Sequence, residues 1–355
     1  MPLQFVSQLS LLGWDDWFQE RFALFARQGY APARVIADFG AEFLVHDGAA
    51  SLRAVGGRHL HNDGGSLPAV GDWVALRHRE PIATIHGWVE RKSAFSRKVA
   101  SVETREQVLA ANVDVAFVVA SAQDVNARRI ERYLTMAWQS GAAPVVVLTK
   151  SDIAASADEL RLELESVAAG TPVVVTSAIT GEGVGELAQQ LRPARTGVLL
   201  GPSGAGKSSL INRMAGAQLM KTRAVHRSGD GRHMTSHREL IQLPGGGMVI
   251  DTPGLREAQL WTGEDALGSV FDDIERVAQD CRFNDCEHRS EPGCAIKAAI
   301  ESGELDPARL ESHRKLQREL RAVAAKSDAR LRIEDRRKWK QIASDLKVRE
   351  RLLGR

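Results

Sequence analysis

The sequence is poor in cysteine and has no long hydrophobic stretch. Only three cysteines occur among its 355 residues, and all lie between Cys281 and Cys294. An odd, closely spaced set argues against a disulfide framework and favours a reducing, cytoplasmic setting. No apolar run approaches the roughly 20 residues that a transmembrane helix needs. The N-terminal residues lack the basic start and cleavage site of a secretion signal, so the sequence predicts neither a secreted nor a membrane protein.

Net charge is also small, since the formal value is only +2. The charges are unevenly distributed, however. From Arg309 to Arg355 the chain has sixteen Lys and Arg against seven Asp and Glu, in stretches with helical spacing such as RKLQRELRAV. A stripe of basic residues is typical of phosphate binding, but a solvated helix face has the same composition. RNA binding and a purely structural helix therefore both stay open for this tail.

The first 96 residues predict two structural parts. Residues 1–30 carry aromatic side chains that favour an amphipathic helix docked on the body of the protein, with partner binding as the alternative. These side chains are Trp14, Trp17, Phe18, Phe22 and Phe25. Residues 31–96 contain short strand-like runs with turn signals between them, such as ARVIADFG and VGDWVALR. This spacing predicts a small β-barrel, either an OB-fold, which is favoured, or an SH3-like barrel.

Residues 97–265 alternate strand-like apolar runs with helical segments. DVAFVVAS, PVVVLTKSD, PVVVTSA, TGVLLGPSG and MVIDTPG each end in polar or Gly residues. Helices are expected between several of them, for example over 128–139 and 159–168. This alternation predicts an α/β domain with a mostly parallel sheet. Ligands bind at the carboxyl ends of strands in such sheets, where the motifs described next all lie.

The segment GPSGAGKS matches the phosphate-binding pattern G-x-x-x-x-G-K-[ST] after the strand-like run TGVLL. Its glycines let backbone N–H groups surround the phosphates, and the following helix adds a partial positive charge. We expect Lys207 to reach the β- and γ-phosphates and Ser208 to bind Mg²⁺. The predicted nucleotide-binding residues here are Gly201, Pro202, Ser203, Gly204, Ala205, Gly206, Lys207, Ser208 and Ser209.

Two further motifs indicate guanine. TKSD provides Thr149, Lys150 and Asp152, and its carboxylate can accept hydrogen bonds from the ring N–H and the exocyclic amine of guanine. Adenine lacks both donors in that arrangement, so the carboxylate would stay unpaired. TSA places Ser177 and Ala178 to contact the guanine carbonyl through the backbone. The sequence therefore predicts a protein that binds GTP or GDP with Mg²⁺.

DTPG predicts the part of the site that senses the γ-phosphate. Asp251 is placed to hold Mg²⁺ through water, and the N–H of Gly254 to contact the γ-phosphate. Between the phosphate loop and DTPG, the polar segment SGDGRHMTSHREL is typical of a switch loop. Thr235 is the expected Mg²⁺-binding hydroxyl, and Ser236 is its rival.

The group that orients the attacking water is not the usual one. Leu255 stands where many GTPases have a Gln, and its side chain cannot hydrogen-bond water. Slow turnover by the free protein is therefore expected. His233 and His237 flank the expected Mg²⁺ hydroxyl, and His233 is the favoured catalytic candidate, together with Thr235 and Lys207. His237 begins a strand-like run, which makes it the weaker alternative.

The three cysteines and one histidine have metal-ligand spacing. The pattern C-x₄-C-x-H-x₅-C brings together Cys281, Cys286, His288 and Cys294. Three thiolates and an imidazole suit tetrahedral Zn²⁺, and a closed set of four protein ligands indicates one structural ion. The surrounding segment has little apolar core, so metal binding would supply much of its folding energy.

The order of these motifs is a circular permutation of the usual GTPase order, because the guanine motifs precede the phosphate loop. Together with the GRHMTSHREL switch and the cysteine cluster, they resemble the RsgA (YjeQ) family of ribosome-associated GTPases over roughly residues 31–320. Met234 departs from the H-T-T-T run of that family. The resemblance implies an α/β, circularly permuted GTPase core over 97–265, an N-terminal OB-fold, and a C-terminal helical zinc domain over 266–355.

The resemblance also implies a function in late maturation of the small ribosomal subunit. The expected activity is GTP hydrolysis stimulated by that subunit, with rRNA binding, by a cytoplasmic monomer. The alternative is a nucleotide-gated RNA-binding module in which GTP is a timer and turnover is incidental. A GTPase acting on another RNA or on a membrane is a third and weaker reading, since the sequence has no basic amphipathic anchor or lipidation motif.

Overall fold

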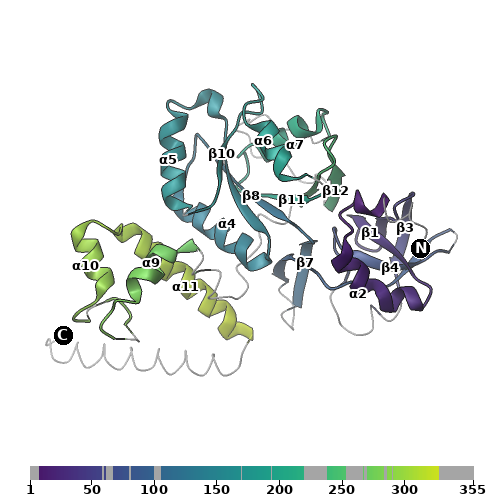
Figure 1. The fold of residues 1–355 in the computed structure, drawn as a ribbon, viewed down its shortest axis with the longest axis horizontal. Coiled ribbons are helices and arrows are strands. Elements are labelled where there is room, and N and C mark those ends of the chain that lie inside the picture. The colour runs from purple at the N-terminus through teal and green to yellow at the C-terminus, as the bar shows by residue number, and fades with distance from the viewer. Residues whose placement is uncertain are drawn as a thin grey trace, which may run out of the picture. The chain divides into compact units, whose positions relative to one another are not determined.

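The computed structural model describes residues 8–57, 60, 67–79, 81–99, 105–168, 170–192, 194–219, 238–252, 267, 270–283, 286–289 and 291–327. The chain divides into two compact units, Met1–Gln259 and Leu260–Arg355 (Figure 1). The first unit contains both the barrel and the nucleotide-binding sheet. None of the helices in the described ranges is long and apolar enough to cross a membrane.

The predicted parallel sheet is present in the first unit. Its strands are β8 (Val115–Ser121), β9 (Ala143–Thr149), β10 (Val173–Val175), β11 (Thr196–Leu200), β12 (Arg238–Gln242) and β13 (Met248–Asp251). Their spatial order is β10-β9-β8-β11-β13-β12, with all pairs parallel except β12–β13. Strands β8 and β11 are buried along their whole length, as expected for a sheet covered on both faces.

Helices lie between these strands, as the sequence predicts. They are α4 (Ala127–Ser140), α5 (Ala157–Val167), α6 (Val184–Gln190) and α7 (Lys207–Ala215), with a 3₁₀ turn over Ser151–Ile153. Local signals set the bounds of α4: the Asn126 side chain accepts a hydrogen bond from the Arg129 N–H, and Gly141 ends the helix at φ 86°. The predicted helices over 128–139 and 159–168 are thus confirmed within a few residues.

The circular permutation is visible in the strand order. Strand β11, which leads into the phosphate loop, lies inside the sheet between β8 and β13. Strand β9, which ends in Thr149, precedes β11 in the chain but lies only two positions away in space. The chain therefore enters the sheet at a different point from an ordinary GTPase while filling the same strand positions.

The five strands that precede this sheet close into a barrel. They are β1 (Ala31–Asp38), β2 (Phe43–His46), β3 (Ser51–Gly56), β4 (Trp73–Arg77) and β5 (Ala83–Trp88). The order β1-β2-β3-β5-β4 closes through pairing of β1 with β4, and β3 and β5 are parallel. This arrangement is OB-like, which decides between the two barrels that the sequence left open. Strands β6 (Ala94–Val99) and β7 (Arg105–Ala111) form a separate hairpin.

An amphipathic helix, α2 (Asp16–Arg27), packs its aromatic face on this barrel. Trp14 and Phe18 are buried, and the Trp14 ring lies edge-on to Trp73 of β4 at 4.7 Å between centroids. Phe22 is also buried, at 1% exposure. These aromatic residues therefore form core between the helix and the barrel, as the docked-helix prediction states.

The second unit is helical in its described part. It contains α9 (Asp272–Ala278), α10 (Ala295–Ser302) and the long α11 (Pro307–Ser327). Arg309 of α11 binds both carboxylate oxygens of Asp273 and the carbonyl of Val270, which fixes α11 to α9. One basic residue of the C-terminal tail thus serves the fold of this unit.

Candidate functional site

The predicted nucleotide motifs gather at one edge of the parallel sheet. Thr149 is the last residue of β9, and Asp251 is the last residue of β13. TSA directly follows β10, and the phosphate loop connects β11 to α7. Because the carboxyl ends of parallel strands share one edge, these motifs face a common site.

The phosphate loop has the backbone conformation that its glycines predict. At Gly201, φ is 152°, and a Cβ atom there would lie only 2.5 Å from the carbonyl oxygen of Val119, so a side chain does not fit. Gly206 caps α7 at φ 94°. The Nζ of Lys207 donates to the carbonyls of Gly201 and Pro202, at 2.7 and 2.6 Å, and so lies over the loop.

Thr149 connects the guanine motif with the phosphate loop. Its hydroxyl lies 2.6 Å from the carbonyl oxygen of Ala205 and 3.2 Å from that of Ala120. The side chain is 2% exposed. The sequence placed Thr149 only as part of the guanine motif, whereas the structure shows that its hydroxyl connects the end of β9 with the phosphate loop.

Ser177 orients the carboxylate of Asp152. The Ser177 hydroxyl lies 2.6 Å from Oδ1 of Asp152 and also accepts hydrogen bonds from two following backbone N–H groups. The N–H of Ser177 itself donates to the carbonyl of Glu182. That amide is therefore already used, which makes the N–H of Ala178 the better donor for a guanine carbonyl.

Lys150 stands beside this pair in a left-handed backbone conformation, with φ 60°. Such a conformation is uncommon for a residue with a side chain, and it is often found at functional sites. The Nζ of Lys150 lies 3.0 Å from Oε1 of Gln123, across the loop that follows β8. This contact connects the loop after β9 with the loop after β8.

Several predicted residues lie outside the described part of the chain. These are Gly254, Leu255, His233, Met234, Thr235, Ser236 and His237. Their assignments remain predictions. Asp251 is described, and its Cα lies opposite Glu239 of β12.

The predicted metal ligands are brought together in the second unit. The ligand atoms of Cys281, Cys286, His288 and Cys294 all lie within 4.8 Å of one another. Nδ1 of His288 is 3.5 Å from Sγ of both Cys281 and Cys294. Tetrahedral Zn²⁺ with ordinary bond lengths would separate a sulfur and a nitrogen ligand by about 3.6 Å. The residues present therefore fit a four-ligand metal centre.

The surroundings of these ligands affect their protonation. Burial raises the pKa of Cys281, but the backbone N–H groups of Ile296 and Ala295 at the start of α10, together with the thiols of Cys286 and Cys294, lower it, and the net pKa is lowered. Burial, followed by the neighbouring thiols, raises the pKa of Cys286 to about 11. Burial lowers the pKa of His288, and so does the charge of Arg314. A neutral imidazole at neutral pH suits metal coordination.

Arg314 fixes the loop that carries the histidine. It donates to the backbone carbonyl of His288 over 2.6 Å. His288 has φ 59°, a left-handed conformation that a non-glycine residue adopts only when its surroundings impose it. Arg314 of α11, like Arg309, is thus engaged in the fold of this unit.

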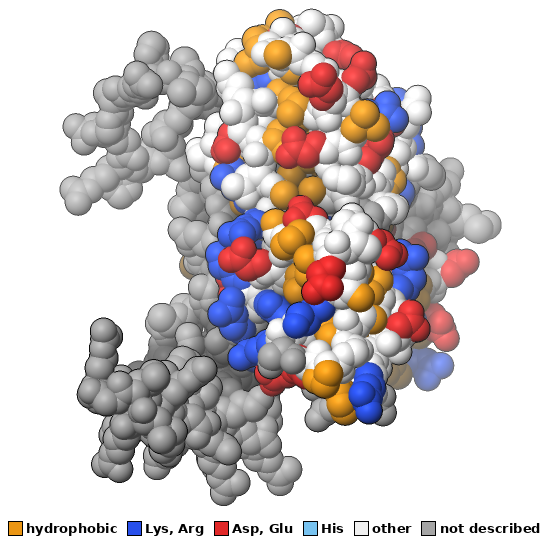
Figure 2. Space-filling view, turned by 90° about the vertical axis from the view of Figure 1, so that its left-hand side faces the viewer, with side chains coloured by type: hydrophobic (Ala, Val, Ile, Leu, Met, Phe, Trp, Pro, Cys, Tyr) orange, Lys and Arg blue, Asp and Glu red, His pale blue; other side chains and the backbone are white. Residues whose placement is uncertain are grey.

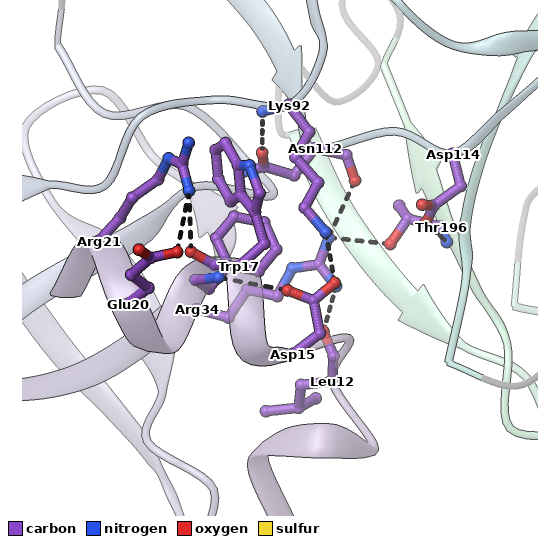
Figure 3. Close-up of polar contacts among 11 residues, drawn as sticks. Leu12, Asp15, Trp17, Glu20, Arg21, Arg34, Lys92, Asn112, Asp114 and Thr196 are labelled. Atoms are coloured by element: carbon purple, nitrogen blue, oxygen red, sulfur yellow. Dashed lines mark hydrogen bonds and ion pairs between the residues drawn. The ribbon is translucent and has the colours of Figure 1, made fainter.

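Arg34 is an important residue that the sequence analysis did not identify. Its guanidinium is buried where the N-terminal segment, the barrel and the nucleotide-binding sheet meet, and it contacts Leu12, Asn112 and Thr196 (Figure 3). It also donates to the carbonyl of Gly71. Burial lowers the pKa of Arg34 to about 10, an effect opposed by the charges of Asp114 and Asp72. A lone Arg within the apolar run ARVIADFG was the available signal.

A cavity of about 460 Å³ lies beside Arg34. Its lining includes Asn112 and Asp114 before β8, Ala194 before β11 and Gly246 before β13. It therefore opens at the amino ends of the strands, on the edge opposite the nucleotide motifs.

Comparison with known proteins identifies the family. A curated protein of Opitutus terrae called "Small ribosomal subunit biogenesis GTPase RsgA" is 45% identical over 363 residues, covering 98% of this chain and 99% of that protein. The chain belongs to the RsgA family. A relative of the same name from Streptomyces avermitilis is 44% identical and covers 95% of this chain and 92% of its own length. RsgA membership makes the chain a GTP hydrolase.

Family profiles and solved structures agree with this assignment. The profile described as RsgA GTPase matches residues 88–261, and one described as 50S ribosome-binding GTPase matches residues 196–351. YjeQ from Thermotoga maritima is similar with a TM-score of 0.62 and 27% identity, covering 82% of this chain and 98% of that one. YloQ, described as a circularly permuted GTPase, matches with a TM-score of 0.58 at 22% identity, which supports the fold.

Proposed function

We propose that this RsgA protein acts in maturation of the small ribosomal subunit and that the subunit stimulates its GTP hydrolysis. The observation that carries the proposal is the match over nearly the whole chain to relatives named for small-subunit biogenesis. The profile named for the 50S subunit covers only residues 196–351, which include the phosphate loop that many GTPases share. The small subunit is therefore the better supported partner. The protein acts in the cytoplasm as a monomer.

The nucleotide-binding roles follow from the geometry at the sheet edge. Backbone N–H groups of the loop, over Ser203–Ser209, bind the phosphates, and Lys207 leaves its loop carbonyls to reach the β- and γ-phosphates. Asp152, oriented by Ser177, accepts from guanine, while the Lys150 stem covers the base. Two further backbone contacts come from Ala178, to the guanine carbonyl, and from Gly254, to the γ-phosphate.

Residues of three segments hold Mg²⁺ in this proposal: Ser208, Thr235 and Asp251. When bound, Mg²⁺ would neutralise the negative charge that develops on the phosphates during hydrolysis. Ser208 lies on the first turn of α7, and Asp251 ends the neighbouring strand β13. Hydroxyl and carboxylate oxygens are the ligands that Mg²⁺ prefers.

His233 orients the attacking water, because Leu255 cannot. Replacing it tests this assignment: His233→Ala keeps GTP affinity and subunit binding but loses most of the stimulated hydrolysis. Stimulated turnover within about twofold of the parent protein would exclude His233 as the catalytic group. His237→Ala, made in parallel, examines the weaker alternative.

The metal centre holds Zn²⁺. Three thiols and one imidazole with the S···N separations given above are typical of a structural zinc site. Metal analysis of the purified protein is expected to give one equivalent of zinc. A value well below one, with the fold of the second unit intact, would exclude the assignment.

Helix α11 supplies an RNA-binding stripe. Lys315, Arg318 and Arg321 are exposed and three residues apart, so they lie on one side of the helix. Arg309 and Arg314 are engaged within the unit, which separates structural from phosphate-binding residues in the basic tail. Figure 2 shows that basic and acidic side chains are both exposed on the face it draws.

Salt dependence tests this stripe. Combined replacement of Lys315, Arg318 and Arg321 by Ala is expected to weaken small-subunit binding and to reduce the log–log salt slope by about two to three. Replacing the exposed Arg161 and Arg276, which pair with acidic neighbours on their own helices, is the matched control. An unchanged slope in the stripe variant would assign RNA binding to the barrel instead.

The decisive experiment compares the rate of GTP turnover in three samples: the protein alone, the protein with small subunits, and the protein with large subunits. The proposal expects acceleration of at least about tenfold by small subunits and none by large ones. If small subunits bind preferentially in the GTP state without accelerating turnover, GTP is a timer and the protein is a nucleotide-gated binding module. Acceleration by large subunits alone would refute the proposal.

A further inference from the structure

The barrel and the nucleotide-binding sheet form one continuous hydrogen-bonded sheet. Strand β1 of the barrel pairs antiparallel with β12, which in turn pairs with β13. The β1–β12 pairing joins Ala37 with Glu239 and Asp38 with Arg238. Only one strand therefore separates the barrel from the strand that ends in Asp251.

The register places the barrel and Asp251 in the same row. Glu239 faces Ala37 on one side and Asp251 on the other. Adjacent strands lie about 4.8 Å apart, so Ala37 and Asp251 are separated by roughly 10 Å of hydrogen-bonded backbone. A displacement of the end of β1 is transmitted across this row to Asp251.

An ion pair between Arg238 and Asp38 stabilises the pairing of β1 with β12 at the first residue of β12. Nη1 of Arg238 lies 3.0 Å from Oδ2 of Asp38, and both side chains are largely buried, at 14% and 16% exposure. Charges with so little solvent contact are screened less than surface pairs. Oδ1 of the same aspartate accepts the N–H of Gly40, which holds the turn after β1.

The middle of β1 is fixed as well. Arg34 hydrogen-bonds the hydroxyl of Thr196, the first residue of β11, over 2.8 Å. Strand β1 is thus attached to β11 through Arg34 and to β12 through Asp38. The barrel is therefore held against β11, which leads into the phosphate loop, and against β12, which pairs with the strand that ends in Asp251.

We propose that Arg238, held by Asp38 of the barrel, is a positioning residue for GTP hydrolysis. It fixes the first residue of β12, and Glu239 beside it sets the position of Asp251. The barrel is therefore part of the scaffold of the hydrolytic site, and breaking the ion pair impairs the use of Mg²⁺ and the rate of turnover. The inference rests on the proposed role of Asp251 and does not depend on which ribosomal subunit is the partner.

The test is Asp38→Asn in the full-length protein without ribosomal subunits. Asparagine keeps an oxygen for the Gly40 N–H, so the variant removes the charge and preserves the turn. The turnover number is expected to fall about fivefold and the half-saturating Mg²⁺ concentration to rise about fivefold, while affinity for GDP without Mg²⁺ stays within about twofold. A general loss of folding would instead lower GDP affinity and thermal stability together.

Three further variants test whether the effect depends on the ion pair between Asp38 and Arg238. Arg238→Lys keeps the charge and is expected to retain the parent values within about twofold. Asp38→Asn added to Arg238→Met is expected to cause less than about a twofold further loss, because the two residues act through each other. Glu42→Gln breaks an ion pair with Arg53 elsewhere on the barrel and is expected to leave turnover and Mg²⁺ dependence unchanged.

Asp251→Asn distinguishes a failure of the proposed role of Asp251 in Mg²⁺ binding from a failure of the positioning inference. If it raises the Mg²⁺ requirement and Asp38→Asn does not, the proposed role of Asp251 stands and the positioning inference is refuted. If Asp251→Asn leaves the Mg²⁺ requirement unchanged, both are refuted. Equal effects of Asp38→Asn and Glu42→Gln would likewise overturn the inference, since the effect would not depend on β12.

Discussion

The hydroxyl of Thr149 donates a hydrogen bond of 2.6 Å to the carbonyl of Ala205, and thereby joins the guanine motif to the phosphate loop. Thr149→Val removes this bond with little change of shape. Affinities for GTP and GDP are expected to fall together by about tenfold, because the bond holds a loop used by both nucleotides. Titration with fluorescent nucleotides measures the effect.

The matched control for this change is Thr135→Val. Its hydroxyl also donates to a backbone carbonyl, that of Glu131, in a buried position on α4 away from the loop. Equal nucleotide affinities of Thr149→Val and Thr135→Val would show that the link to Ala205 does not support binding.

Base selectivity is expected to depend on Asp152 and on the serine that orients it. Asp152→Asn replaces an acceptor by an amide that can also donate, so affinity for GTP should fall by about 10- to 100-fold and that for xanthosine triphosphate should rise. Ser177→Ala removes the 2.6 Å contact to Asp152 and should lower the preference for GTP over ATP by about threefold. Competition binding with the three nucleotides checks both, and Ser166→Ala, on the exposed side of α5, is the control.

Removal of the metal is expected to increase local unfolding in the second unit and to leave the first unit unchanged. Hydrogen exchange is expected to accelerate over residues 270–300 after chelation, while GDP affinity stays within about twofold. The bound metal cross-links its four ligands, and the small apolar core of this segment does not provide an equivalent stabilisation. Unchanged exchange in the metal-free protein would mean that the unit folds without the ion.

Metal affinity should increase with pH. Since the pKa of Cys286 is raised to about 11 in the metal-free protein, its thiol carries a proton at neutral pH and must lose it to coordinate the ion. Protons compete with the metal below that pKa, so affinity rises as pH rises from about 6 to 9. Calorimetry in buffers of different ionisation enthalpy should detect proton release on binding. Affinity independent of pH would contradict the argument.

Arg34 is expected to contribute strongly to the stability of the first unit. Arg34→Met leaves the carbonyls of Leu12 and Asn112 without the buried donor that Arg34 supplies. The free energy of unfolding should fall by about 3 kcal/mol. Denaturation followed by fluorescence of Trp73, which lies next to the guanidinium, reports the change. The exposed Arg53→Met is the control, and a loss no larger than in that variant would refute the prediction.

Local patterns predicted the strands that carry the nucleotide motifs, because each motif directly follows a strand that an apolar run reveals. Thr149, Asp251 and the phosphate loop lie at the strand ends where the sequence placed them. The permutation followed from motif order alone. The cysteine cluster was predictable for the same reason, since all four ligands lie within one short segment.

Contacts between distant segments were not predictable in this way. Arg34 and Thr196 are 162 positions apart, and Asp38 and Arg238 are 200 apart. No spacing rule connects such pairs, and the charge of Arg34 conflicts with the apolar run around it. His233 and Thr235, the predicted catalytic histidine and Mg²⁺-binding hydroxyl, lie outside the described residues, so their roles remain predictions.

The pairing of β1 with β12 has a consequence for solubility. Without the barrel, β12 would be the last strand of the nucleotide-binding sheet, with free N–H and C=O groups along its outer side. Exposed strand edges recruit other chains and promote aggregation. Pairing with β1 at Arg238 and Glu239 covers the start of this edge, so a chain shortened to begin after the barrel is expected to aggregate more readily than the full-length protein.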